Sequence, residues 1–308
     1  IFGSFPTLKS LKLVLDVAMD LSFFEALKAL RLVNLNIAFL HPQANIEASG
    51  LKHLAVGMKN SRDSLQSLKL LLSSNQASPL SEEVIEALGD IVLIPKALRI
   101  LWIWCEYSFA DFQRFFRRFE GITQLEELKI SILIDGAFPD SAHALSSFIA
   151  QNQSLKELQV FYESINPKLD EVSVIHEAIQ QLPNLKTLEW KLGEDQTIPL
   201  DSVVQMIDHI KGLETFDLTT EGPFLNSDQV MVKFFTAIYR SKTLKDFRLK
   251  TPFDKITKAG LTWMGENLHK LKNFDVVYLE NTGTKKIKKN EANTTVLDAL
   301  HLIKLSQV

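Results

Sequence analysis

The sequence has only one cysteine among its 308 residues. A single thiol cannot form an intrachain disulfide, which favours a reducing, cytoplasmic compartment. The most apolar stretch, residues 91–104, is interrupted by Pro95, Lys96 and Arg99, so it is not a plausible membrane span. The chain also lacks the basic excess of nucleic-acid-binding proteins, because 34 Lys and Arg face 37 Asp and Glu. We therefore expect protein partners, without a membrane span or specific nucleic-acid binding.

Motifs that mark catalytic or cofactor sites are missing as well. The sequence has no GxxxxGK[ST], GxGxxG or GxSxG pattern, and its seven histidines show no HExxH spacing or similar metal-ligand spacing. Cys105 has neither a CxxC partner nor a recognisable histidine-bearing nucleophile motif near it, and we interpret it as a buried structural thiol. We expect no catalytic, cofactor-binding or metal-binding residues, and hence no enzyme.

The chain does contain a six-residue core, Leu-x-x-Leu-x-Leu, repeated along its length. The copies are LKSLKL (8–13), LKALRL (27–32), LQSLKL (65–70), LRILWI (98–103), LEELKI (125–130), LKELQV (155–160), LKTLEW (185–190), LETFDL (213–218), LKDFRL (244–249), LKNFDV (271–276) and a weaker LDALHL (297–302). From Leu98 onward their first leucines are 27, 30, 30, 28, 31, 27 and 26 residues apart, whereas the earlier steps of 19, 38 and 33 are irregular. A period near 28 residues suits one strand and one helix per unit.

These copies resemble the leucine-rich repeat, and their period is similar to that of the ribonuclease-inhibitor-like subclass. The resemblance covers roughly residues 5–305 and implies an α/β solenoid, a horseshoe of about 10–11 repeats. Its parallel β-sheet would line the concave face and its helices the convex face. We expect a single leucine-rich-repeat domain over residues 1–308, with irregular repeats in 1–97, regular repeats in 98–281, a basic loop in 282–295 and a closing repeat in 296–308.

One departure from the family pattern has a structural consequence. The family motif carries Asn or Cys at its ninth position, where this chain has residues such as Asp16, Ser73, Glu106 and Glu163. Without the buried asparagine ladder, we expect irregular strand-to-helix loops. Phenylalanine replaces leucine at the fourth position of three successive units, which predicts a buried aromatic row. These phenylalanines are Phe216, Phe247 and Phe274.

Segments between the cores carry helix signals. Ser81 and Ser227 precede acidic and then apolar residues, which is typical of helix N-caps. In the run SFADFQRFFRRFE, Ser108 is a candidate cap, and Phe112, Phe115, Phe116 and Phe119 form a stripe that predicts a buried helix face. Arg114, Arg117 and Arg118 then face outward, as a solvated surface or as a nucleic-acid contact. The basic loop carries Lys285, Lys286, Lys288 and Lys289, which could be a mobile, solvated loop or could contact an acidic partner, a phosphate surface or a nuclear-import receptor.

Strand alternation separates packing residues from surface residues. The first, fourth and sixth motif positions point inward, and the third, fifth and seventh point to the concave surface. This rule predicts that Trp190 lies in the core and that two other tryptophans lie on the sheet surface, where a partner or another segment of the same chain would cover them. The predicted partner-binding residues are Trp102, Trp104, Ile100, Leu71, Phe161, Lys69, Lys129 and Arg31.

The pattern favours a non-enzymatic protein-protein interaction module, or a scaffold subunit of a larger assembly, that binds its partner on the concave sheet. Two alternatives follow from the resemblance. Some members of the subclass activate GTPases, but no residue-level match is visible here. A substrate-recognition subunit of a ubiquitin ligase would need an adaptor-binding helical motif near the N-terminus, and none is visible in this sequence.

Overall fold

The fold is built on one sheet of ten parallel strands whose order in the sheet is their order in the chain. The computed structural model describes residues 7–15, 21–39, 48–72, 81–108, 112–134, 139–164, 169–193, 200–222, 224–253, 255–267, 270, 274 and 276–281. The strands are β1 (Ser10–Leu15), β2 (Asn34–Phe39), β3 (Ser67–Leu72), β4 (Ile100–Ser108), β5 (Glu127–Ile134), β6 (Glu157–Ser164), β7 (Thr187–Leu192), β8 (Thr215–Thr220), β9 (Asp246–Thr251) and β10 (Val276–Asn281).

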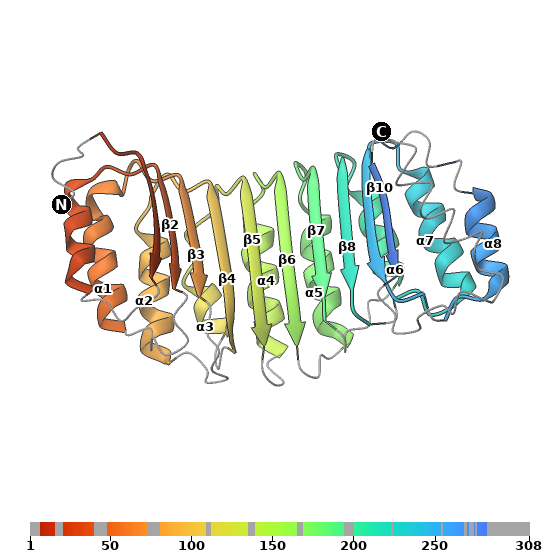
Figure 1. The fold of residues 1–308 in the computed structure, drawn as a ribbon, viewed down its shortest axis with the longest axis horizontal. Coiled ribbons are helices and arrows are strands. Elements are labelled where there is room, and N and C mark those ends of the chain that lie inside the picture. Colours follow the sequence, from red (N-terminus) through yellow and green to blue (C-terminus); the bar gives the residue numbers. More distant parts are fainter. Residues whose placement is uncertain are drawn as a thin grey trace.

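Helices form a second layer behind this sheet. They are η2 (Leu21–Ala29), α1 (Ala48–Gly57), η3 (Met58–Ser61), α2 (Glu82–Leu93), α3 (Phe112–Arg117), α4 (Pro139–Gln151), α5 (Leu169–Gln180), α6 (Leu200–His209), α7 (Asp228–Arg240) and α8 (Lys258–Asn267). η2 contacts α1, and each α-helix contacts the next α-helix along the chain. In Figure 1 the strands lie in front of the helices, and the row of helices extends beyond the sheet at both ends. The chain is thus a solenoid-like α/β array, and no helix among its described residues is long and apolar enough to cross a membrane.

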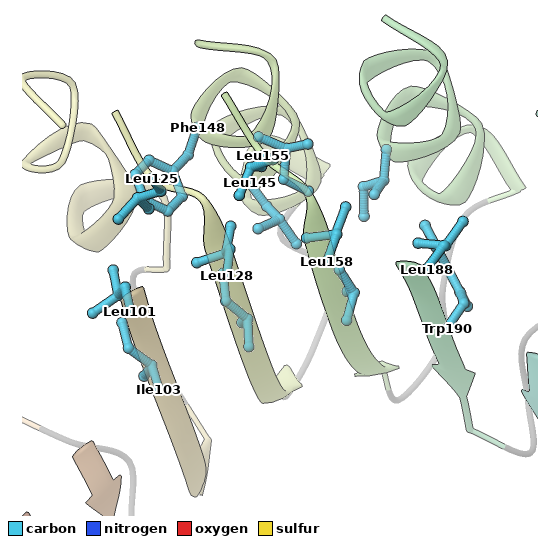
Figure 2. Packing of buried hydrophobic residues seen from close by; sticks show 14 of the residues in the cluster. Leu101, Ile103, Leu125, Leu128, Leu145, Phe148, Leu155, Leu158, Leu188 and Trp190 are labelled. Carbon is cyan, nitrogen blue, oxygen red and sulfur yellow. The ribbon is translucent and has the colours of Figure 1, made fainter. Parts of the chain in front are cut away.

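The core lies between the two layers because alternate strand residues point toward the helices. In β7 and β8 every second side chain is buried, and the residues between are half-exposed. Figure 2 shows Leu101, Leu128 and Leu158, from three neighbouring strands, packed together with Leu145 and Phe148 of helix α4. The first motif position is buried as well, as at Leu98 and Leu125. The predicted inward positions are therefore confirmed across the central units.

Two repeats are placed differently from the sequence prediction. Residues 27–32 do not form the second strand, because Leu27 lies in η2 and β2 begins only at Asn34. The true copy is LVNLNI (32–37), in which Leu32, Leu35 and Ile37 are buried. Near the other end, Val277 rather than Phe274 pairs with Phe247, which shifts the tenth copy to FDVVYL (274–279). The leucine-rich hexamer at 27–32 matches the repeat core because a helix also buries leucines at short spacing.

The aromatic row is correspondingly shorter than predicted. Phe216 and Phe247 are fully buried on adjacent strands, and their rings stack with centroids 6.4 Å apart. Phe274 is buried too, but it occupies a first motif position, so it does not continue this row at the fourth position. Phe234 and Phe235 of helix α7 complete the cluster against Phe247.

Asparagine and glutamine side chains do tie neighbouring units together, although at a different place from the family ladder. They lie where a helix ends and the chain returns to the sheet, and they bond backbone groups of the preceding unit 27 to 32 residues away. Asn152 is the buried case: its Oδ1 accepts from the Leu125 N–H at 3.1 Å while its Nδ2 donates to the Phe148 carbonyl at 2.9 Å. Satisfying buried backbone groups in this way stabilises the junction between units.

Most local predictions on helices and core residues are confirmed. The Ser81 and Ser227 hydroxyls accept from the Val84 and Val230 amides at 3.4 and 3.3 Å. Cys105 and Trp190 are buried, as are the three phenylalanines of the predicted stripe whose side chains are described, Phe115, Phe116 and Phe119. The cap predicted at Ser108 is wrong, because that residue is the last of β4 and pairs with Leu133. Many of the strand-to-helix residues, the basic loop 282–295 and the closing repeat 296–308 lie outside the described residues.

Candidate partner-binding surface

The sheet face turned away from the helices, here called the open sheet face, carries three rows of side chains that cross the strands in register. The row formed by seventh motif positions is the most unusual. Over β1–β9 it consists of Val14, Ala38, Leu71, Trp104, Ser131, Phe161, Lys191, Thr219 and Lys250. This seventh-position row has no acidic residue in those nine strands, and it changes from apolar or small residues on β1–β6 to polar and basic residues on β7–β9.

Trp104 is the most accessible aromatic side chain of this row, with 43% of its surface exposed. It stacks on Phe161 with ring centroids 6.3 Å apart and planes inclined by 20°. The two residues stand on β4 and β6, about 9.6 Å apart at the usual strand spacing, so both rings lean over the strand between them. Ser131 on that strand is buried beneath the rings, although its position faces away from the core. A small residue between two large ones makes this arrangement possible.

A shallow pocket of about 190 Å³ lies at these rings. Trp104, Ser131 and Phe161 line it on one side, and Trp102, Lys129 and Gln159 line it on the neighbouring row. Its lining is mainly apolar, with an ammonium and an amide at the edge. Such a mixture suits an apolar side chain that arrives with a polar neighbour.

Trp102, by contrast, is engaged within the protein. The ammonium of Lys69 lies 2.9 Å from its ring centroid and that of Lys129 lies 4.3 Å away. Its indole Nε1–H donates to Glu127 at 2.7 Å, and the same carboxylate pairs with Lys129 at 3.1 Å. Burial lowers the pKa of Lys69, a shift that Lys129 reinforces and Glu127 opposes. The ring of Trp102 therefore makes cation–π contacts with two lysines of the same chain and is not a free apolar surface.

The aromatic pair is bordered by a third cation, Lys191, whose ammonium lies 4.4 Å from the Phe161 ring centroid. Its ammonium pairs with Glu221 at 3.9 Å. On β5 and β6 the acidic residues Glu127 and Glu157 lie at third positions, and Glu280 of β10 continues the seventh-position row in register with Lys250. Lys191 therefore places a cation in the seventh-position row directly beside the aromatic pair.

A separate acidic pair lies in the fifth-position row, where Glu189 and Asp217 occupy adjacent strands. Burial raises the pKa of Asp217 to about 6, and repulsion from Glu189 adds to this effect, while Arg248 and Lys250 oppose it. No group of three or more His, Cys, Asp or Glu side chains within the described ranges is arranged to hold a metal ion.

Seven of the eight predicted partner-binding residues lie on the open sheet face. Trp102 is joined with Lys69 and Lys129, and Trp104 with Phe161, while Ile100 and Leu71 occupy neighbouring places on β4 and β3. Arg31 does not belong to this surface: it is exposed and precedes β2, because the second repeat begins at Leu32. The prediction missed Ser131, Lys191 and Glu127, although the motif register already placed all three on this face.

Two of the three arginines in the Arg/Phe run form ion pairs with the neighbouring helix. Arg114 pairs with Glu82 and Glu86 of helix α2, and Arg118 pairs with Asp90 of the same helix. These contacts favour the interpretation of a solvated helix face over a nucleic-acid surface.

The amino-acid sequence matches no protein-family model, and no curated protein shows significant similarity to it.

Proposed function

We propose that this chain is a non-enzymatic protein-interaction module, a leucine-rich-repeat horseshoe that binds a protein partner on its sheet. The observation that carries the proposal is the Trp104–Phe161 pair, which stacks on the open face of a regular sheet with Trp104 43% exposed. Exposed aromatic residues concentrate binding energy in interfaces, at about 2 kcal/mol or more each in favourable cases. A protein without a partner for this surface gains nothing from leaving Trp104 in water.

The architecture supports the same conclusion. In a horseshoe the sheet lines the inner, shorter side, and the helices form the outer, longer side. A row of helices that extends beyond the sheet at both ends agrees with that arrangement. A surface held by continuous strand pairing is preorganised, so binding costs little conformational entropy. We place this module in the cytoplasm, as part of a larger complex.

The experiment compares three forms of the protein by affinity purification and quantitative mass spectrometry: the wild type, the double variant Trp104→Ala/Phe161→Ala and the control Leu93→Ala. Leu93 on helix α2 is 41% exposed, close to the 43% of Trp104, but it belongs to the helix layer. We expect the partner to be lost by the double variant, by tenfold or more, and retained by the control. Equal recovery by a folded double variant would contradict the proposed surface.

Trp102 is left unchanged in this test. Its removal would release Lys69, Lys129 and Glu127 from their contacts and alter the local charge as well as the apolar surface. A loss of binding after Trp102→Ala would therefore have two causes that a pull-down cannot separate.

A further inference from the structure

We infer that the partner binds through an extended acidic segment, which places one apolar side chain on the Trp104–Phe161 pair and a carboxylate on the Lys191 side of it. This inference rests on the proposed function, and it names the chemistry of the partner at that same surface. It is carried by the composition and geometry of the seventh-position row rather than by the exposed aromatic rings alone.

The apolar part of the segment is determined by the rings. Two of the large apolar side chains that are well exposed among the described residues, Val14 and Trp104, lie in the seventh-position row, and the third, Leu93, lies in the helix layer. The pocket at Trp104, Ser131 and Phe161 has a volume of about 190 Å³. This volume suits one aliphatic or aromatic side chain rather than a larger molecule.

The charge of the segment is determined by the cations around the rings. Lys129 lines the pocket on one side and Lys191 lies over Phe161 on the other. A lysine or arginine in the bound segment would lie beside both ammonium groups, and like charges brought together at an interface weaken binding. Lys129 pairs with Glu127 at 3.1 Å and Lys191 with Glu221 at 3.9 Å, so Lys191 is the more loosely paired of the two and the better placed to attract an acid.

The spacing of the strands predicts where the acid lies in the partner sequence. The pocket is centred over β5, since Ser131 forms its floor, and Lys191 stands on β7. Two strand spacings amount to about 10 Å, and an extended chain advances about 3.3 Å per residue. A segment that crosses the strands therefore carries its carboxylate about three residues from the apolar anchor.

The test is a selection of random 12-residue peptides displayed on phage against the whole chain. Parallel selections use Lys191→Glu and a control, Lys52→Glu, which changes an exposed lysine on helix α1. Wild type and control should enrich an apolar residue with Asp or Glu about three positions away, and Lys191→Glu should enrich Lys or Arg there. A selected acidic peptide should bind Lys191→Glu at least tenfold more weakly in 50 mM NaCl and less than about threefold more weakly in 500 mM, because salt screens this attraction. The control should stay within about twofold of wild type.

The outcomes separate the inference from the proposed function. Peptides that need Trp104 and Phe161 but show no acidic enrichment, or that bind Lys191→Glu unchanged, overturn the inference and leave the proposed surface standing. Peptides that bind Trp104→Ala/Phe161→Ala as well as wild type, or a selection that yields no specific binder, overturn both.

Discussion

Replacement of His176 by leucine should make the protein less sensitive to acid. The imidazole lies on helix α5, almost fully buried, with its ring centroid 4.7 Å from that of Trp190 in β7. Its Nδ1 has no hydrogen-bond partner among the described residues. Burial lowers the pKa of His176 to about 4 because the charged form cannot be solvated there. Leucine has a similar volume and removes the titration while keeping the site apolar.

The sign and the size of the effect follow from the two protonation equilibria. The unfolded chain binds a proton at His176 with a pKa of about 6.5, so between pH 6.5 and pH 4 the unfolded state is the more protonated one. The contribution of the neutral imidazole is therefore present above pH 6.5 and is lost as the pH falls through about 4. The full loss is about 3 kcal/mol, of which about 2 kcal/mol falls between pH 7 and pH 5.

Urea unfolding of wild type and His176→Leu at pH 7 and pH 5 measures this effect. The comparison between the two proteins is needed because other groups titrate in the same range. Asp217 has a raised pKa of about 6, so its contribution to stability grows as the pH falls, opposite to His176. That contribution is the same in both proteins and cancels. Parallel pH profiles, with no relative gain for the variant at pH 5, would refute the assignment of a buried neutral imidazole.

Three further substitutions test the packing of the helices and the junction between units. Gly57→Ala should destabilise the protein by several kcal/mol in thermal unfolding, because an added Cβ would collide with the Phe24 carbonyl group. Gly265→Ala, with open space around the added Cβ, should instead stabilise helix α8 by up to about 1 kcal/mol. Asn152→Ala should cost about 1–3 kcal/mol in urea unfolding, because the buried Leu125 N–H loses its acceptor; an unchanged midpoint would show that this bridge is dispensable.

Trp102 and Trp104 have different surroundings despite being two residues apart. Both Trp102 and Trp104 point to the open sheet face, and the sequence pattern treats them alike. The difference comes from their neighbours across the strands: Trp102 meets Lys69 and Lys129, whereas Trp104 meets Leu71 and the small Ser131. Trp102 therefore packs against two ammonium groups, whereas the exposed Trp104 is the residue on which we propose that a partner binds.

Much of the fold was predictable because the same local pattern is repeated. The burial of Leu101 and Ile103 and the outward direction of Trp104 follow from strand alternation within one unit. The repeats at the two ends were harder, because a leucine hexamer in η2 and the apolar residues at 274–279 each allow more than one register. Only hydrogen bonding to the neighbouring strand selects between those registers.

The sequence by itself determined the period and which side chains of the central units face the core, while the parallel sheet was expected from the resemblance to the leucine-rich repeat. These properties depend on residues within one unit, where three-residue and two-residue spacings translate directly into direction. The tertiary structure alone decided that Trp104 and Phe161 lean together over Ser131 and that two lysine ammonium groups lie over the ring of Trp102. The physical reason is distance along the chain: contacting residues on adjacent strands are about 30 positions apart, Trp104 and Phe161 are 57 apart, and such contacts depend on packing that no local pattern encodes.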